Sequence, residues 1–356
     1  MDFTHGPSRP ESTTLPHRLA TFSPVRLIAS AAIFLAAGVI LHNAPAHATT
    51  STLPSLTQIL SDVSQSVTMT KAPNPSATLP PLTSMTQNDA SLAPQRYGCW
   101  AKDGTSSVIP SNALTYCAYG DTTVSRIILL TGDSQAGMWL PSVDAMGLRL
   151  GWKVIFLAMR ECGPWSSPNP ASFVLYKTLT VAECNTHNAN VAAWATAHKV
   201  SVVLFSGRSY PVGRNIDLPP KLTTLEKEMS ATAAAFAPSG AKLIVIGPIP
   251  RYDSVTSTVL PSDCIDGATN FANCQVSPTK LLPKVEIAAE TVEVNAGKFH
   301  YAKMFPLMCT ATKCTTVIKD GTQTHLVYYD GAHINRYFGV WASQAFQDIV
   351  AKLLPA

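Results

Sequence analysis

Charged side chains are scarce in this chain of 356 residues. Asp, Glu, Lys and Arg make up 13% of the sequence, against about 25% in an average soluble domain. The formal net charge of +4 is spread along the chain without a cluster of Lys and Arg, and such clusters are typical of segments that bind nucleic acid. We therefore expect no nucleic-acid partner.

Long apolar runs are also lacking, and the longest lies near the N-terminus. Residues 27–41, "LIASAAIFLAAGVIL", are fifteen residues without a charge, whereas a membrane-spanning helix needs about 20. Arg18 and Arg26 precede this run, and residues 46–48 (Ala-His-Ala) fit the small-x-small pattern of a cleavage site. Residues 1–48 are therefore predicted to be an export signal. The long segment before the run leaves an uncleaved membrane anchor open, and both alternatives place the rest of the chain in the periplasm or cell envelope.

Metal-binding motifs are missing as well. The sequence has no CxxC pair and no HExxH motif, which disfavours zinc, and we expect neither a metal ion nor another cofactor. The eight cysteines lie outside the predicted signal, and an even number of cysteines in an exported chain indicates disulfides. Pairing in sequence order is the simplest arrangement: Cys99 with Cys117, Cys162 with Cys184, Cys264 with Cys274, and Cys309 with Cys314.

Two further segments follow the predicted signal. Residues 49–95 are rich in Ser, Thr and Pro and have few aromatic residues, a composition that favours a mostly disordered linker. A weak helix is predicted within it at residues 53–67. Globular structure is predicted from residue 96, so that residues 96–356 form a single domain.

The domain alternates short apolar runs with helical patterns. Alternation of this kind indicates a doubly wound α/β fold of three layers, with a mostly parallel sheet covered on both faces. Ligands in such folds bind beyond the carboxyl ends of the strands. The predicted strands are residues 126–131, 152–158, 201–206, 242–248 and 299–305, and the predicted helices are residues 135–150, 185–199, 222–237 and 277–297.

One serine lies where the first of these strands ends. Ser134 follows Gly132 and Asp133 and precedes a predicted helix, whose free N–H groups favour developing negative charge. A nucleophilic serine needs a base and a group that orients the base. Asp330 and His333, three residues apart in the stretch "LVYYDGAHINRYFGVWASQAF" and just before its helical segment, can supply both. The sequence therefore predicts a catalytic triad of Ser134, His333 and Asp330.

Other interpretations of these residues are plainer. Ser134 in a Gly-Asp-Ser turn can serve only as a helix cap, and Asp-x-x-His can be an ordinary surface turn. His325 is the nearest rival base, but its position in an apolar strand favours a structural role. Trp139 is expected in the core rather than in a substrate site. The joint occurrence of both motifs at strand ends favours catalysis.

The motifs resemble those of a known family, the SGNH or GDSL-like serine esterases and acyltransferases. The resemblance extends over residues 96–356 and is most specific to the SGNH domain fused behind family-3 membrane acyltransferases. It implies a flavodoxin-like three-layer sandwich, with Ser134, Asp330 and His333 as the triad. The motifs are "LLTGDSQAGMW", "RECGPW", "CTATKC" and "YYDGAHIN".

One motif of that family is altered. Many SGNH enzymes place an Asn after the third strand, in a Gly-x-Asn-Asp motif, as an oxyanion donor. Here the stretch reads "LFSGRSYP", with no Asn after Gly207. We expect the Ser134 backbone N–H to be supplemented by Gly163 and Arg208, while a role for these two residues in shaping loops stays open.

The function implied is serine-dependent transfer of an acyl group, expected to be acetyl, to an envelope polysaccharide, or its removal. Related domains act on O-acetyl groups of such polysaccharides, so the implied partners are a glycan acceptor or acylated glycan and a membrane protein that donates the acyl group. The altered motif leaves another class open, an inactive SGNH-like module that binds polysaccharide for a partner enzyme.

Overall fold

The computed structural model describes residues 53–85, 98–101, 108–167, 174–176, 179–208, 221–253, 260–267, 270–321 and 323–355. All of these belong to one unit, Thr52–Ala356. The predicted export signal at residues 1–48 lies outside the described residues. Within the described ranges, no helix is both long and apolar enough to cross a membrane.

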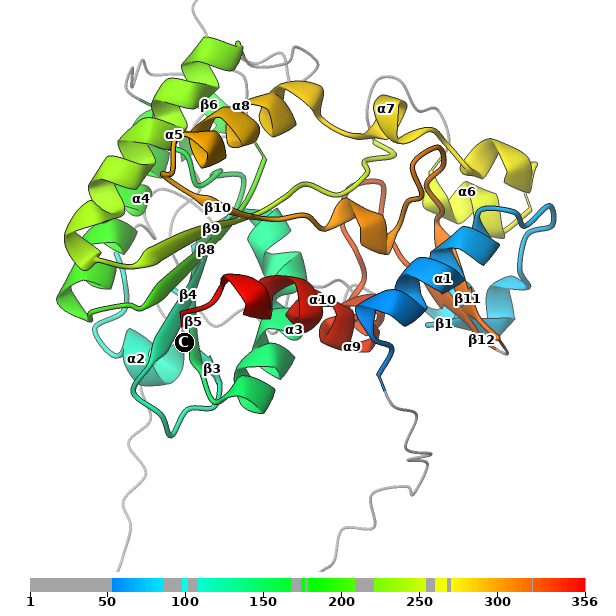
Figure 1. Cartoon of the computed structure of the whole chain (residues 1–356), viewed down its shortest axis with the longest axis horizontal. Helices are drawn as coiled ribbons and strands as arrows, with labels where there is room; N and C mark the ends of the chain where they lie inside the picture. Colours follow the sequence, from blue (N-terminus) through cyan, green and yellow to red (C-terminus); the bar gives the residue numbers. More distant parts are fainter. Residues whose placement is uncertain are drawn as a thin grey trace, which may run out of the picture. The chain divides into compact units, whose positions relative to one another are not determined.

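A seven-stranded sheet forms the centre of this unit (Figure 1). Five of the parallel strands, β4, β5, β8, β9 and β10, counted one to five along the chain, lie in the order 2-1-3-4-5, which is the flavodoxin-like order. The short strand β2 extends the sheet parallel to β5. The predicted fold class, a mostly parallel three-layer sandwich, is confirmed. The strands are β2 (Trp100–Ala101), β3 (Ala118–Gly120), β4 (Ile127–Gly132), β5 (Lys153–Met159), β8 (Val202–Ser206), β9 (Lys242–Ile246) and β10 (His300–Ala302), of which β3 pairs antiparallel with β5.

The central strand β4 shows how the sheet separates two hydrophobic cores, one on each face. Ile128 and Leu130 point into one core, and Ile127 and Leu129 into the other. Side chains alternate between the faces of a strand, so a continuous apolar run is buried on both sides. One face is covered by α3 (Ser134–Leu150), α9 (Arg336–Trp341) and α10 (Ser343–Val350), and the other by α4 (Val181–Ala197), α5 (Leu222–Phe236) and α8 (Lys284–Asn295) (Figure 1).

The helix predicted at residues 277–297 is two helices, α7 (Pro278–Leu281) and α8. Pro283 separates them. Proline disfavours helical backbone in the residue before it, and Leu282 is extended, with ψ at 138°.

The predicted linker is where the structure differs most from expectation. Residues 56–66 form α1, whose Ile59 and Val63, together with Val67 after it, are buried in the core that also contains α3 and α10. Their spacing of four residues places them on one helix face. Farther along, β1 (Thr78–Leu79) pairs with β12 (Gln323–Leu326), which in turn pairs with β11 (Val317–Asp320). The described part of residues 49–95 is therefore ordered on the domain, and the prediction of mostly disordered chain is wrong there.

Four disulfides join segments that lie close in the sequence, and all eight cysteines are paired. The pairs are Cys99–Cys117, Cys162–Cys184, Cys264–Cys274 and Cys309–Cys314. This is the pairing in sequence order. The remaining elements are short: α2 (Ala113–Tyr116), α6 (Pro261–Ile265), β6 (Val174–Tyr176) and β7 (Leu179–Thr180).

Candidate active site

The turn between β4 and α3 presents Ser134 at the carboxyl edge of the sheet. Gly132 has φ at 137°, and a Cβ there would collide with the carbonyl oxygen of Ser206, so only glycine fits. The N-cap of α3 is Asp133, whose carboxylate accepts a hydrogen bond of 2.8 Å from the N–H of Gln135. Because Asp133 caps the helix, Ser134 is its first residue and its hydroxyl does not serve as the cap.

The Ser134 hydroxyl instead lies against His333. The distance from its Oγ to His333 Nε2 is 2.7 Å, and His333 Nδ1 lies 2.9 Å from one carboxylate oxygen of Asp330 and 3.0 Å from the other. Ser134 and His333 come together although 199 residues separate them. The structure therefore brings the three predicted triad residues into one hydrogen-bonded chain.

The carboxylate of Asp330 is held in place by backbone groups of its own loop. Its Oδ1 accepts 2.7 Å hydrogen bonds from the N–H groups of Ala332 and His333. Burial acts to raise the pKa of Asp330, but the hydrogen bond and charge of His333, with these N–H groups, outweigh it and lower the pKa below its usual range. Asp330 is thus an anion at neutral pH, fixed against the histidine ring.

Neighbouring elements fix the loop that carries Asp330 and His333. The carbonyl oxygen of Gly331 accepts hydrogen bonds from the N–H groups of Tyr252 (2.7 Å) and Asp253 (3.2 Å). A Cβ at Gly331 would lie 2.8 Å from the Asp253 nitrogen, so this close approach requires glycine. From the other side, the amide of Gln135 donates to the Ala332 carbonyl at 3.1 Å. The loop is therefore bound both to α3 and to the segment after β9.

Asp133 has a second task besides capping. It is fully buried, and its Oδ2 accepts a hydrogen bond of 2.9 Å from the backbone N–H of Arg208, after β8. Burial raises the pKa of Asp133, opposed by the N–H groups of Arg208 and Gln135. This bond ties the loop after β8 to the residue next to Ser134, and it also occupies the Arg208 N–H. The Arg208 guanidinium makes a separate contact, with the Asp253 carboxylate at 2.6 Å.

The loops after β5 and β8 meet although β4 lies between these strands. A Cβ on Gly207 would lie 3.3 Å from the Cα of Gly163 and would collide with Pro164. The Gly163 carbonyl is held by the amide of Asn188 at 3.1 Å. Within the described part of the chain, the N–H groups of Ser134 and Gly163 have no hydrogen-bond partner. Their roles as oxyanion donors stay predictions.

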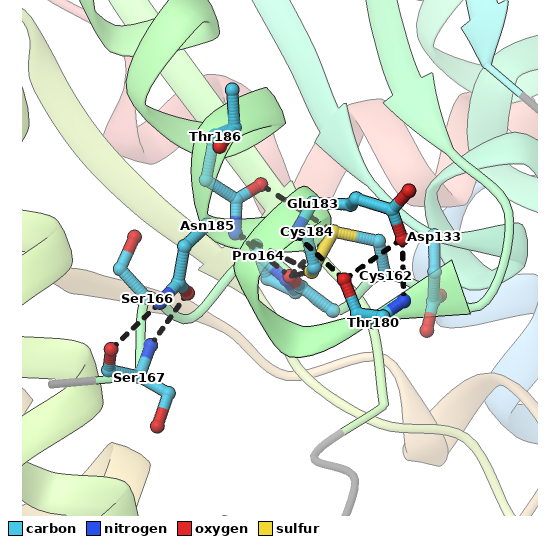
Figure 2. The surroundings of a disulfide bond; sticks show 12 residues. Asp133, Cys162, Pro164, Ser166, Ser167, Thr180, Glu183, Cys184, Asn185 and Thr186 are labelled. Carbon is cyan, nitrogen blue, oxygen red and sulfur yellow. Dashed lines mark hydrogen bonds between the residues drawn. A yellow bond between two sulfur atoms is a disulfide. The ribbon is translucent and has the colours of Figure 1, made fainter. Parts of the chain in front are cut away.

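A disulfide attaches the Gly163 loop to α4 (Figure 2). Cys162 is joined to Cys184, one residue after Glu183, which forms a capping box with Thr180 at the start of α4. Farther along the loop, Ser167 and Asn185 exchange hydrogen bonds of 2.9 and 2.8 Å. The disulfide and these hydrogen bonds hold the loop beside Gly163 in one conformation.

Two further residues weighed from the sequence lie away from the triad. His325 is buried, bonded through Nε2 to Asp320 at 2.8 Å and stacked on Trp341 at 4.0 Å, which is the contact set of a structural residue. Trp139 is fully buried and packs against Phe346.

Sequence reasoning missed Asp253, because nothing in the "PRYDS" stretch predicts contact with residue 331. It also missed the double role of Asp133, which its place in the Gly-Asp-Ser turn could have suggested. Among the described residues, no group of three or more His, Cys, Asp or Glu side chains could hold a metal ion.

Comparisons with known proteins agree with this architecture. The family model described as "SGNH domain (fused to AT3 domains)" matches residues 99–348. A lipopolysaccharide acetyltransferase periplasmic domain from Salmonella ser. Paratyphi A aligns with a TM-score of 0.51 and 14% identity, over 71% of this chain and 90% of that one. Two more distant structures also align. A GDSL-like lipase from Bacteroides thetaiotaomicron has a TM-score of 0.36 and 10% identity, over 65% of this chain and 90% of that one. A putative acylhydrolase from Bacteroides fragilis has a TM-score of 0.38 and 9% identity, over 69% of this chain and 95% of that one. A search of the curated proteins finds no match.

Proposed function

Because this chain belongs to the family of SGNH domains that occur fused to AT3 domains, we propose that it is a serine-dependent O-acyltransferase or esterase acting outside the cytoplasm. Acyl transfer and ester hydrolysis are the reactions that the family membership supports. The observation that carries the finer proposal is the hydrogen-bonded chain from Ser134 Oγ through His333 to Asp330.

In the proposed mechanism, His333 Nε2 takes the proton of Ser134 as its oxygen attacks the ester carbonyl. The carbonyl oxygen becomes an oxyanion, to which the N–H groups of Ser134 and Gly163 donate, with Arg208 as a further donor. The intermediate collapses to an acyl-serine, and the leaving alcohol takes the proton from His333. Asp330 stabilises the imidazolium between these steps and keeps Nδ1 protonated.

The second half-reaction decides between transfer and hydrolysis. A sugar hydroxyl, or water, loses its proton to His333 and attacks the acyl-serine, and Ser134 leaves with that proton. We propose an envelope glycan as acceptor and acetyl as the acyl group, since the Salmonella neighbour is a lipopolysaccharide acetyltransferase domain. A membrane protein that supplies the acyl group is the proposed partner. Four disulfides favour an exported protein.

A second candidate is a module that binds polysaccharide without turnover. Two observations favour it: no Asn follows Gly207 in the motif, and the Arg208 N–H is already bound to Asp133. One experiment separates the candidates. The protein is incubated with p-nitrophenyl acetate, with and without an oligosaccharide acceptor, and analysed by intact mass. An enzyme releases p-nitrophenol and gains one acetyl group at Ser134, and faster release with the acceptor identifies a transferase. A binding module gives neither release nor mass gain.

A further inference from the structure

Asp253 lies in the loop that follows β9 and binds two arginines, Arg208 from the loop after β8 and Arg251 from its own loop. Its Oδ2 lies 2.6 Å from Arg208 Nη2, and its Oδ1 lies 3.2 Å from Arg251 Nε. Burial acts to raise the pKa of Asp253, but the charges and hydrogen bonds of the two arginines outweigh it and lower the pKa. The carboxylate is therefore ionised at neutral pH, and the pair with Arg208 is a short charge-assisted hydrogen bond.

The same residues connect the serine side of the site with the histidine side. The Arg208 backbone is bonded to Asp133, which precedes Ser134. The Arg208 guanidinium is bonded to Asp253, whose own N–H donates to Gly331, between Asp330 and His333. The Arg208 side chain thus extends from the loop beside the serine to the segment after β9, which is itself bonded to the loop that carries the histidine. Its far end is fixed by the Asp253 carboxylate.

We propose that Asp253 is a positioning residue for acyl transfer, which holds the Arg208 guanidinium where it donates a hydrogen bond to the oxyanion formed at Ser134. This inference rests on the proposed function. A guanidinium presents several N–H donors in a planar fork, so one edge can bind Asp253 while another meets the substrate. The position at which many SGNH enzymes have an Asn donor is thereby served by a cation with a fixed direction.

The substitution Asp253→Asn tests the carboxylate separately from the backbone. Asn has the same shape, and the backbone N–H that binds Gly331 is kept, so only the charge that orients Arg208 is lost. Loss of a whole oxyanion donor lowers kcat by about 10²–10³, so we expect kcat for p-nitrophenyl acetate to fall by about 10-fold or more, with KM nearly unchanged. Arg251→Gln is the matched control, since it removes the other ion pair of the same carboxylate. It should keep kcat near the parental value, and an equal fall in both variants would contradict the inference.

Rescue by free guanidinium gives a readout that a merely structural role would not change. Arg208→Ala should lower kcat, and guanidinium chloride at millimolar concentration, far below denaturing levels, should restore part of it by occupying the vacated place beside Asp253. In the double variant Arg208→Ala with Asp253→Asn, no rescue is expected. Asp253→Asn should also add little to the loss already caused by Arg208→Ala. Equal rescue in both backgrounds, or fully multiplicative losses, would overturn the role of Asp253.

Different results would contradict the proposed function and the role of Asp253. If Ser134→Ala keeps the parental activity, or the parental protein never forms an acyl-serine, then the proposed function fails and the inference with it. If the parental protein acylates at Ser134 and Asp253→Asn acylates at the same rate, the function stands and only the inference fails. A stopped-flow burst of p-nitrophenol measures this acylation rate directly in both proteins.

Discussion

The hydroxyl of Ser134 takes no part in capping α3, because Asp133 does so. Removal of this hydroxyl therefore tests catalysis separately from stability. We expect Ser134→Ala to lower kcat by about four to six orders of magnitude, as in other serine triads. The free energy of unfolding should change by no more than about 0.5 kcal/mol. Turnover of p-nitrophenyl acetate and urea unfolding measure the two effects, and parental turnover in the variant would exclude Ser134 as nucleophile.

Asp330 combines two functions in one side chain, and Asp330→Asn separates them. The Asn oxygen can still accept from the N–H groups of Ala332 and His333, so the loop should keep its conformation. The Asn amide would then face His333 Nδ1 as a donor and favour the wrong tautomer. We expect kcat/KM to fall by about 10⁴, with a circular dichroism spectrum like that of the parent. An unchanged kcat/KM would show that Asp330 does not orient the base.

At this scale the triad could be predicted from sequence, whereas its supports could not. The Ser134 turn and the Asp330–His333 pair each occupy a recognisable local motif, and Ser134 follows a predicted strand of the parallel sheet, at the edge where such folds bind ligands. The strand before Asp330, β12, lies instead in a separate sheet with β1 and β11. Asp253 has no local motif. Its position depends on the contact of its backbone with Gly331, a contact that only the folded chain defines. The oxyanion donors were predicted by family resemblance alone, and their roles stay predictions.

Among the elements, α1 is the one whose contribution to the fold is most easily measured. Ile59 lies on the inner face of this helix and is completely buried, whereas its neighbour Leu60 is 39% exposed. Truncation of a buried isoleucine removes apolar contacts and leaves a cavity, so Ile59→Ala should cost about 2–5 kcal/mol of unfolding free energy. Leu60→Ala, the matched control, should cost about 0.5 kcal/mol or less. Equal and small effects would mean that α1 does not fold with the domain.

Helix α4 contains a buried histidine that should make the fold sensitive to acid. His187 is 1% exposed, and burial lowers its pKa from 6.5 to about 4. Above pH 6.5 it is neutral in both the folded and the unfolded chain. As the pH falls toward 4, the unfolded chain binds the proton first, so stability is lost by up to about 3 kcal/mol.

His187→Leu should remove this sensitivity. Neither ring nitrogen of His187 has a hydrogen-bond partner in the described structure, so leucine leaves no partner unsatisfied. The variant should unfold at pH 7 with at least parental stability and should lose less stability than the parent between pH 6.5 and 4. Urea unfolding at several pH values measures this difference. A parallel decline in both proteins would contradict the assignment.

The long central strands could be predicted because each is a continuous apolar run buried on both faces. Most of the short elements could not, apart from β10 and the strand that contains His325. β1 gains its structure by pairing with β12, which lies more than 240 residues later in the chain, and its two residues carry no periodic signal. The weak helix predicted at residues 53–67 is present as α1, but the surrounding Ser, Thr and Pro residues favoured disorder for the rest of the segment. Burial against α10 and β11 outweighs that composition.

Across the whole molecule, each disulfide encloses only a short segment of the chain. Three disulfides join cysteines that are 10 to 22 residues apart in the sequence, and the fourth joins cysteines that are 5 residues apart. None joins distant parts of the chain, so the long-range arrangement of the site depends on the sheet, the two cores and the hydrogen bonds around Gly331. The disulfides instead fix local loops, and the Cys162–Cys184 bond fixes the loop that carries Gly163.

Since only the Cys162–Cys184 disulfide fixes the loop that carries Gly163, its removal should affect catalysis as well as stability, whereas removal of the Cys309–Cys314 disulfide should affect stability alone. In the loop-entropy model, a separation of 22 residues is worth about 3 kcal/mol and one of 5 residues about 2 kcal/mol. We expect replacement of Cys309 and Cys314 by serine to lower the unfolding free energy while kcat remains parental. Replacement of Cys162 and Cys184 should lower both, because the freed loop would no longer hold Gly163 where we propose that its N–H donates to the oxyanion. Non-reducing peptide mapping of each variant should recover the three remaining pairs. Parental kcat in the Cys162–Cys184 variant, measured well below its Tm, would show that Gly163 is not an oxyanion donor.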